Sequence, residues 1–146
     1  MATEIIMLKA RNVYEIVPWS LGWNVVGLKW VFAVKWTEDR GLEKQKAQTI
    51  AKGFTQVIGE DYRETYASVA QLESIHLVCA IVAFWQLWQI DFVSAFLNNN
   101  NTYDIYMEQP KRFEEGKDDH VWKLQKTLYG TMQEAHDWVE NLDKTF

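Results

Sequence analysis

The sequence predicts an α+β fold in which a helix packs on a mainly antiparallel sheet. Two patterns support this class: large apolar side chains recur at every second position over residues 29–37, and residues 70–86 are almost continuously apolar. Short strand-like runs separated by turn residues supply the remaining strands. Because 48% of the 146 residues are hydrophobic, the chain is long and apolar enough to form one globular domain.

The first two expected elements are a helix and a strand. Ile5 and Leu8 are apolar and three positions apart, which predicts a short helix over residues 3–11. The stretch "NVYEIVP" predicts a strand that ends at Pro18. A turn-rich connection that contains two glycines follows.

The next segment predicts a β-hairpin. Over residues 29–37 the large apolar side chains share one face and the lysines share the other, so we expect a half-buried strand. The stretch "TEDRG" supplies the turn, and residues 42–53 return as a second strand. The basic residues at the even positions of this second strand are Lys44, Lys46 and Lys52. The hairpin is therefore expected to have a basic face.

The second half of the chain predicts one buried helix followed by short strands. Residues 70–86 have the length and the apolar character of a buried helix. Residues 87–92, "LWQIDF", follow as a short buried strand that ends at Asp91. The stretches "DIYMEQP" and "HVWKLQ" predict two further strands, and residues 133–145 predict a polar closing helix.

Composition and charge exclude several classes of function. The net charge of −5 and the isoelectric point of about 5.2 lack the basic excess of an autonomous nucleic-acid binder, so any contact with a polyanion must be local. The single cysteine, Cys79, excludes an internal disulfide framework. The N-terminus carries no secretory signal, and the longest apolar stretch is too short to span a bilayer. We therefore expect an intracellular protein, cytoplasmic or nuclear, with no membrane partner.

Asp91 is the one acidic residue in an apolar and aromatic stretch. A buried carboxylate is costly unless it has a partner, so a buried Asp91 needs one. Two accounts remain open. Asp91 accepts hydrogen bonds from nearby backbone N–H groups as a structural cap, or it binds a hard cation such as Mg²⁺, which prefers oxygen ligands.

Five stretches follow one another along almost the whole chain: "KWVFAVKW", "EKQKAQTIAKGFTQVIGEDYRETYASVAQLESI", "QIDFVSAFLN", "IYMEQPKRFEEG" and "VWKLQKTLYGTMQEAHDW". This succession resembles the reverse transcriptase domain of Ty1/copia-type retrotransposon polyproteins, and its details look closest to fungal elements. The resemblance implies that residues 1–146 hold the fingers and the first half of the palm of an RNA-directed DNA polymerase. It implies an RNA/DNA primer–template, deoxynucleoside triphosphates and the rest of the polyprotein as partners.

The resemblance also implies a metal role for Asp91. In this family the aspartate of the "Q-x-D-x-x-x-A-F-L" block is the first Mg²⁺-binding aspartate of the palm, with the carbonyl of Phe92 as the expected second oxygen. A second block of catalytic carboxylates, Tyr-x-Asp-Asp, is expected beyond Phe146 and is absent from this sequence. Asp118 and Asp119 lie in a polar turn and do not match that block. Enzymatic activity of this chain is therefore left open.

Four further residues receive nucleotide-binding roles from the resemblance. Phe96 matches the aromatic residue under the incoming sugar, and Gln133 matches a glutamine near the incoming nucleotide. Lys46 and Lys52 would face the triphosphate or the template by charge. Each has a purely structural alternative: a core phenylalanine, a residue at a helix N-terminus and lysines on a solvated strand face.

The pattern departs from the family at several arginine positions. Gln48, Gln71 and His136 stand where family members usually have arginine, and the chain contains eight tryptophans. Cytosine-to-thymine changes convert arginine codons to tryptophan, glutamine or histidine codons. The departures fit a decayed copy of a retrotransposon or ordinary divergence of a lineage. The alternative function is therefore a non-catalytic remnant or a small module that binds nucleic acid or protein.

Overall fold

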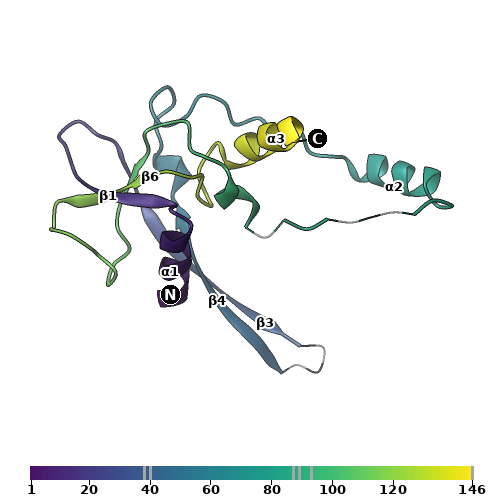
Figure 1. The fold of residues 1–146 in the computed structure, drawn as a ribbon, viewed down its shortest axis with the longest axis horizontal. Helices are drawn as coiled ribbons and strands as arrows, with labels where there is room; N and C mark the ends of the chain where they lie inside the picture. The colour runs from purple at the N-terminus through teal and green to yellow at the C-terminus, as the bar shows by residue number, and fades with distance from the viewer. Residues whose placement is uncertain (38, 40, 87, 89, 93, 146) are drawn as a thin grey trace.

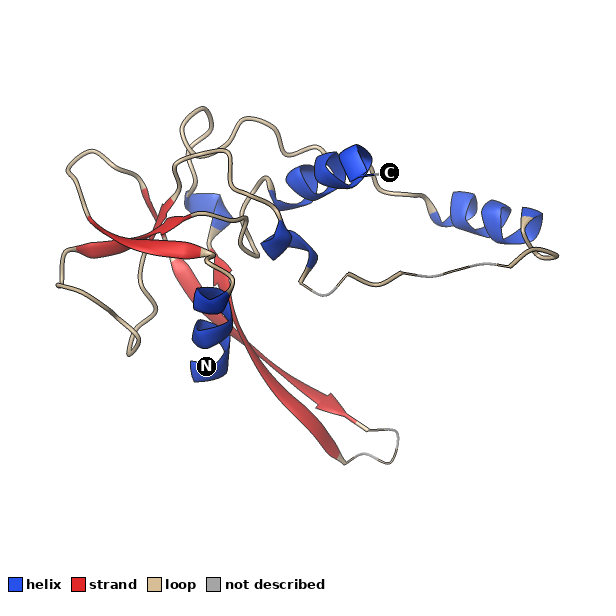
Figure 2. Ribbon diagram, in the orientation of Figure 1, coloured by secondary structure: helices blue, strands red, loops and turns tan. Residues whose placement is uncertain are grey.

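The structure is a computed structural model that describes residues 1–37, 39, 41–86, 88, 90–92 and 94–145 (Figure 1). In chain order the elements are α1 (Ala2–Ala10), β1 (Tyr14–Pro18), β2 (Val25–Val26), β3 (Leu28–Trp36), β4 (Leu42–Ala51), η1 (Gly53–Thr55), α2 (Leu72–Ile81), η2 (Ala95–Asn98), β5 (Tyr106–Met107), β6 (His120–Leu124) and α3 (Glu134–Thr145). The elements η1 and η2 are short 3₁₀ helices. This mixture of helices and strands confirms the predicted α+β class (Figure 2).

Four short strands form one sheet in the order β1-β6-β5-β2. β1 pairs antiparallel with β6, and β6 pairs antiparallel with β5. β2 pairs parallel with β5, so this sheet is mixed. The strands predicted around "NVYEIVP" and "HVWKLQ" are confirmed as β1 and β6. The strand predicted for "DIYMEQP" shortens to the two residues of β5, and β2 was not predicted.

The core lies between this sheet, α1 and η2. Tyr14 of β1 stacks on Trp122 of β6 with 3.8 Å between the ring centroids. α1 is confirmed as a helix, and its buried residues are Ile5 and Leu8. The other apolar residues with no exposed surface are Val13, Val26, Leu97, Ile105, Met107 and Leu128. The core therefore draws on segments from both halves of the chain.

β3 and β4 form the predicted hairpin, which extends from the body of the molecule as a two-stranded ribbon (Figure 1). The pairing runs from Leu28–Ala51 to Trp36–Leu42 and shifts register between Lys35 and Trp36. The expected half-burial is wrong for the outer part, because Phe32 is 64% exposed. A two-stranded ribbon has no second layer against its outer half, so its apolar side chains remain in solvent.

α2 confirms the predicted helix but is shorter than residues 70–86, and the prediction that it is buried is wrong. It points away from the body of the molecule, at the end opposite the mixed sheet (Figure 1). None of its residues is buried, and Leu77 is 62% exposed. Its apolar character indicates burial only where a covering layer exists, and no such layer covers it in the described part of the chain.

The predicted buried strand at residues 87–92 is also not observed. Residues 88 and 90–92 belong to no strand, and positions 87 and 89 lie outside the described residues. Asp91 is exposed, so the expectation of a buried carboxylate is wrong. Without a strand to pair beside it, an isolated segment cannot form the ladder of hydrogen bonds that defines a strand.

The C-terminal helix is confirmed as α3. Among the described residues, no helix has both the length and the apolar character needed to cross a membrane.

Candidate functional site

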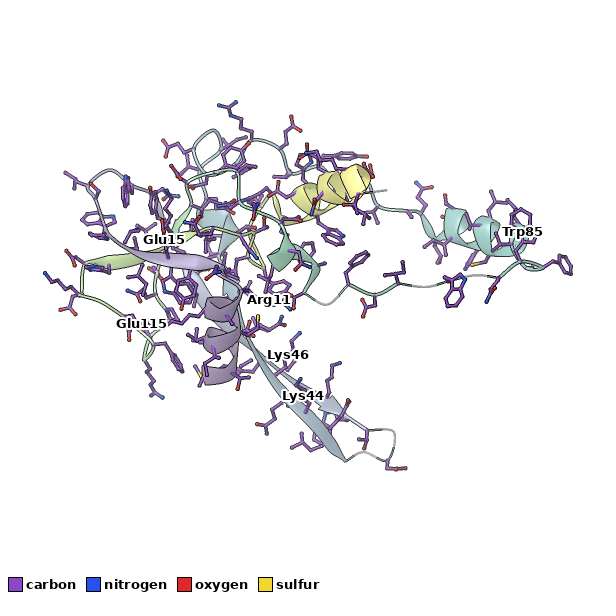
Figure 3. All side chains as sticks on the ribbon, viewed as in Figure 1. Arg11, Glu15, Lys44, Lys46, Trp85 and Glu115 are labelled. Atoms are coloured by element: carbon purple, nitrogen blue, oxygen red, sulfur yellow. The ribbon has the colours of Figure 1, made fainter. Side chains whose placement is uncertain are left out.

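The hairpin carries four lysines on one face, which we call the basic face: Lys29, Lys35, Lys44 and Lys46. Residues that lie directly opposite each other in an antiparallel pair share a face. Lys35 lies directly opposite Lys44, and Ala33 lies opposite Lys46. The basic face predicted from alternation is therefore confirmed for these residues, and Figure 3 shows Lys44 and Lys46 projecting from the ribbon.

The positive charge of the basic face is not neutralised within the described residues. Lys35, Lys44 and Lys46 are exposed. The ion pairs in the described part of the chain involve Lys9, Lys123, Lys144 and two histidines, and none involves the basic face. Like charges placed directly opposite each other on a strand pair are destabilising. A bound anion would relieve the repulsion between Lys35 and Lys44.

Lys46 also lies near the first helix. Burial raises the pKa of Glu4 on α1 above its ordinary value. A backbone hydrogen bond from Thr49 and the positive charge of Lys46 lower this pKa and offset part of the rise. The charge of Lys46 therefore acts on one partly buried carboxyl, that of Glu4, while the Lys46 side chain remains exposed.

Lys52 lies at the root of the hairpin, beyond the end of β4. Its backbone N–H donates to the carbonyl of Gly27 over 2.8 Å, and its side chain lies against the Cα of Gly27. Lys46 and Lys52 are six positions apart, so at about 3.3 Å per residue their Cα atoms lie roughly 20 Å apart. The two lysines therefore cannot contact the same phosphate.

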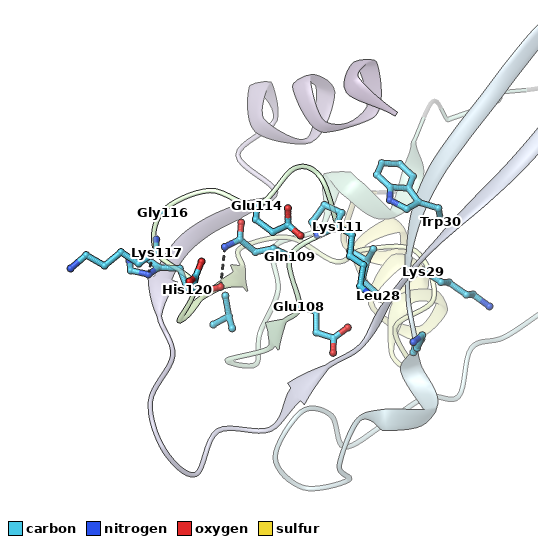
Figure 4. Close-up of a pocket in the computed structure, with 14 residues that line it drawn as sticks. Leu28, Lys29, Trp30, Glu108, Gln109, Lys111, Glu114, Gly116, Lys117 and His120 are labelled. Carbon is cyan, nitrogen blue, oxygen red and sulfur yellow. Dashed lines mark hydrogen bonds between the residues drawn. The ribbon is translucent and has the colours of Figure 1, made fainter.

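Lys52 and Lys29 line a cleft of about 960 Å³ between the hairpin root and the loop that leads into β6 (Figure 4). The side-chain Nε2 of Gln109 donates to the carbonyls of Glu115 and His120 over 2.8 and 2.9 Å, which fixes the wall of the cleft formed by this loop. Further charged residues that line the cleft are Lys111, Lys117, Glu108, Glu114 and Asp118. Charges of both signs line the cleft, so it does not select a polyanion.

The segment 129–133 docks on the end of β4. The N–H of Ala51 donates to the carbonyl of Tyr129 over 2.8 Å, and the N–H of Gly53 donates to the carbonyl of Gly130 over 3.1 Å. The N–H of Gly130 in turn donates to the Glu134 carboxylate over 2.5 Å. Burial raises the pKa of Glu134 above its ordinary value, and this hydrogen bond offsets part of the effect.

Gln133 lies directly before α3 and is 1% exposed. Its carbonyl accepts a hydrogen bond from the N–H of Asp137 over 2.9 Å, as expected for a residue at a helix N-terminus. Its side-chain amide contacts Gln56 at 3.2 Å and Asn101 at 3.4 Å. The side chain of Gln133 is therefore engaged inside the molecule.

Phe92 and Phe96 both pack on the C-terminal part of the chain. Phe92 meets Trp138 of α3 edge-on with 5.0 Å between the ring centroids. Phe96 of η2 meets Tyr129 edge-on with 5.8 Å between the centroids. Edge-to-face geometry is a favourable arrangement for aromatic pairs. The two contacts hold the segment after Asp91 against the residues around α3.

Asp91 does not form a metal centre with its surroundings in the described structure. It is exposed, and the described residues contain no group of three histidine, cysteine, aspartate or glutamate side chains that could hold a metal ion. Two-metal phosphoryl transfer needs carboxylates that converge on one small volume. The described residues therefore do not fit a complete Mg²⁺ site, and no reaction step is assigned to one.

Comparison with known proteins decides the family. Residues 11–146 match the family described as reverse transcriptase (RNA-dependent DNA polymerase). The chain belongs to this family. It is 34% identical over 146 residues to the retrovirus-related Pol polyprotein from transposon RE1 of Arabidopsis thaliana, a match that covers 97% of this chain and 10% of that protein. It is 36% identical over 146 residues to the corresponding polyprotein from transposon TNT 1-94 of Nicotiana tabacum, a match that covers 98% of this chain and 11% of that protein.

A yeast relative is more distant. The transposon Ty1-BL Gag-Pol polyprotein of Saccharomyces cerevisiae is 28% identical over 104 residues, which cover 66% of this chain and 6% of that protein. The Ty1/copia-type resemblance is confirmed, but its fungal character is not supported, because the two plant polyproteins match at higher identity. This reverse transcriptase chain spans about a tenth of the length of the plant relatives. No solved structure matches it.

The structure of this reverse transcriptase segment brings some of the predicted site residues together. Phe96 contacts Tyr129 of the segment 129–133, and Gln133 belongs to that segment. Lys52 lies between Ala51 and Gly53, whose backbone N–H groups bond the same segment. Lys46 lies farther out on the hairpin, and Asp91 precedes η2 on an exposed segment. The functional roles of these residues stay predictions.

Sequence reasoning missed two residues of this region, Gln56 and Asn101. Gln56 is 8% exposed, and its side chain contacts residues 76 and 77 positions away. No spacing or periodicity in the sequence marks contacts of that range. The only sequence signal was that both side chains are amides, which often form buried hydrogen bonds.

Proposed function

We propose that this chain forms the fingers and the first half of the palm of a Ty1/copia-type reverse transcriptase, and that its basic face binds the phosphates of an RNA/DNA primer–template. The observation that carries the proposal is the placement of Lys35 directly opposite Lys44, with no neutralising ion pair in the described structure. Family membership supports the choice of nucleic acid as the polyanion.

The remaining site residues receive roles within the same proposal. Lys46 continues the basic face toward the body of the molecule, and Lys52 approaches the nucleotide side at the hairpin root. Phe96 lies beneath the incoming sugar, and Gln133 adjoins the incoming deoxynucleoside triphosphate. Phe96 is only partly buried, so part of its surface remains accessible for such a contact.

Asp91 and the carbonyl of Phe92 supply oxygen ligands for Mg²⁺ only together with carboxylates beyond those of the described residues. The proposal therefore assigns this chain a binding role, and assigns nucleotidyl transfer to the intact polyprotein in the cytoplasm or nucleus. A non-catalytic module that binds nucleic acid is the second candidate, and the exposed, isolated position of Asp91 favours it.

Fluorescence anisotropy of a labelled RNA/DNA primer–template, titrated at several salt concentrations, tests the proposal. We expect weak binding, with a Kd no tighter than about 10⁻⁶ M near physiological salt. The double variant Lys44→Ala with Lys46→Ala should weaken binding and reduce the salt slope by about 1.5.

The matched control is Lys126→Ala with Lys144→Ala, which makes the same change in net charge away from the hairpin. It should change the affinity and the slope much less. Equal effects of the two double variants would show that the chain responds to its total charge and not to the basic face. Nanomolar, salt-insensitive binding would also contradict the proposal.

A further inference from the structure

Three side-chain amides form a continuous chain of hydrogen bonds, which we call the amide chain: Gln56, Gln133 and Asn101. The Nε2 of Gln56 donates to the Oε1 of Gln133 over 3.2 Å, and the Nε2 of Gln133 faces the Oδ1 of Asn101 at 3.4 Å. The three residues come from the segment after η1, the residue before α3 and the loop after η2. The amide chain therefore joins three separate parts of the fold.

The orientation of each amide follows from backbone groups at the two ends. At one end the N–H of Met132, which can only donate, faces Gln56 at 2.7 Å, so the facing atom must be the Gln56 oxygen. At the other end the carbonyls of Tyr103 and Leu124, which can only accept, face the Nδ2 of Asn101 at 2.7 and 3.4 Å. Both ends therefore require the same orientation of the Gln133 amide, with its oxygen toward Gln56 and its nitrogen toward Asn101.

This arrangement occupies the amide of Gln133 on both sides. Its oxygen accepts from Gln56 and its nitrogen faces Asn101, while the residue is 1% exposed. Because Gln133 is buried, a ligand could reach its amide only if the surrounding groups moved, and breaking either bond would leave a buried polar group unpaired. The side chain of Gln133 is therefore better placed to hold its own segment than to contact a nucleotide directly.

Gln56 is the member of the amide chain that reaches the hairpin. It lies three residues after Gly53, whose N–H donates to the carbonyl of Gly130 over 3.1 Å. Its side chain bonds both the backbone of Met132 and the side chain of Gln133. Gln56 thus connects the end of β4 to the segment 129–133 by side-chain bonds, in parallel with the backbone bonds already described.

We propose that Gln56 is a positioning residue that fixes the segment 129–133, through Gln133 and Met132, relative to the hairpin that holds nucleic acid. The inference rests on the proposed function, because that function places the incoming nucleotide beside this segment. Gln133 then influences the nucleotide through the backbone it holds, and Asn101 anchors the far end of the amide chain. Substitutions of Gln56 should affect nucleotide binding without touching the basic face.

The donor and acceptor roles within the amide chain are tested with two variants, Gln56→Glu and Gln56→Met. A protonated glutamate offers a carbonyl to Met132 and an O–H to Gln133, so it reproduces the glutamine. An ionised glutamate only accepts, so it leaves the Gln133 oxygen without a donor. Urea midpoints should show Gln56→Glu near wild type at pH 3, where the glutamate is protonated in both the folded and the unfolded chain. At pH 8 its folding equilibrium constant should be about 10-fold less favourable.

Gln56→Met should show about the same 10-fold loss at both pH values, because it neither donates nor accepts there. The matched control is Gln45→Glu, an exposed site on β4 that makes the same change in charge. It should follow wild type at both pH values. A Gln56→Glu variant whose difference from wild type is the same at pH 3 and pH 8 would overturn the amide chain.

The positioning role needs a measurement that general loss of stability would not change. With RNA/DNA primer–template and Mg²⁺ present, Gln56→Met should weaken binding of dTTP about 5-fold and leave the affinity for primer–template unchanged. Gln45→Met should change neither. Equal losses of both affinities in Gln56→Met, or no loss of either, would overturn the positioning role.

The two levels of the proposal fail in different ways. A wild-type chain that binds no primer–template contradicts the proposed function, while the urea midpoints still report on the amide chain without nucleic acid. A wild-type chain that binds primer–template but not dTTP overturns the positioning role alone.

Discussion

The backbones of Gly53 and Gly130 are in close contact, and the N–H of Gly53 donates to the carbonyl of Gly130 over 3.1 Å. An added Cβ on Gly53 would collide with the carbonyl oxygen of Gly130, and one on Gly130 would collide with Ala51 and Ile50. Gly130 also has a φ of 84°, in the left-handed region. This close approach brings the end of β4 and the segment before α3 together.

Gly130→Ala should therefore lower the free energy of unfolding by about 3 kcal/mol, since it adds backbone strain and a steric collision. Gly59→Ala is the matched control, because Gly59 has a φ of 90° but no neighbour within 4 Å of an added Cβ. Gly59→Ala should lower the free energy of unfolding only by the backbone strain, about 1 kcal/mol. Urea denaturation measures both, and equal losses would show that the close approach contributes nothing.

The 146-residue chain should not extend a primer in the presence of template, deoxynucleoside triphosphates and Mg²⁺. The reason is that two-metal transfer needs converging carboxylates, and the described residues contain no such group. The sequence also contains no Tyr-x-Asp-Asp segment. A gel-based extension assay measures this, and extension that disappears in Asp91→Asn would contradict the prediction.

Gln48 lies on the basic face, directly opposite Val31, so Gln48→Arg should add one phosphate contact. We expect about a 3-fold gain in affinity for primer–template and a salt slope steeper by about 0.7 to 0.9. Gln45 is the matched control, since it lies one strand position from Lys44 and Lys46 and therefore on the opposite face. If Gln45→Arg gives the same gain in the anisotropy titration, the face of the hairpin does not matter.

The hairpin could be predicted from the sequence because its information is local. Alternation assigns each side chain to a face, and the turn between the strands sets the register. The basic face that carries Lys44 and Lys46 follows from alternation, whereas the pairing of Lys35 with Lys44 comes from the structure. The same local reasoning identified α1, β6 and α3.

The burial of α2 and Asp91 could not be predicted in this way. An apolar stretch indicates that a segment gains from burial, but it does not say which layer covers it. In the described structure nothing covers α2, so the inference from apolarity to burial was wrong there. The amide chain escaped prediction for a related reason, because Gln56 and Gln133 are 77 positions apart and share no local pattern.

The exposed helix α2 should make the chain self-associate. Leu77 and Ile81 are 62% and 60% exposed on neighbouring turns, and Trp85 beyond them is 71% exposed. Exposed apolar patches of this kind favour association. Leu77→Glu with Ile81→Lys places a favourable charge pair on the helix and should raise the monomer fraction in analytical ultracentrifugation.

The control for this double variant introduces the same two charges elsewhere, as Gln125→Glu with Thr102→Lys at two exposed sites. It should leave the monomer fraction unchanged. A wild-type chain that sediments as a single monomeric species with a sharp cooperative melt would contradict the prediction, because it would mean that the chain covers α2 itself.

The stability of the region around α3 should depend on pH through Glu134. Burial raises the pKa of Glu134 above its ordinary value of 4.5, so the folded state disfavours the ionised carboxyl. A raised pKa contributes stability that is present below pH 4.5 and is lost as the pH rises through the folded-state pKa. Glu134→Gln never ionises and keeps an oxygen for the N–H of Gly130. It should therefore gain stability relative to wild type between pH 4 and pH 7.

Glu140→Gln is the control with the opposite sign. The hydrogen bond and charge of Lys144 lower the pKa of Glu140, so its contribution to stability is present at neutral pH and is lost as the pH falls through the folded-state pKa. Relative to wild type, Glu140→Gln should be less stable at pH 7 and should approach wild type in acid. Urea midpoints of both variants across pH 3 to 7 measure the two trends. If both variants shift in the same direction with pH, net charge governs acid stability, and the burial of Glu134 near Gly130 does not.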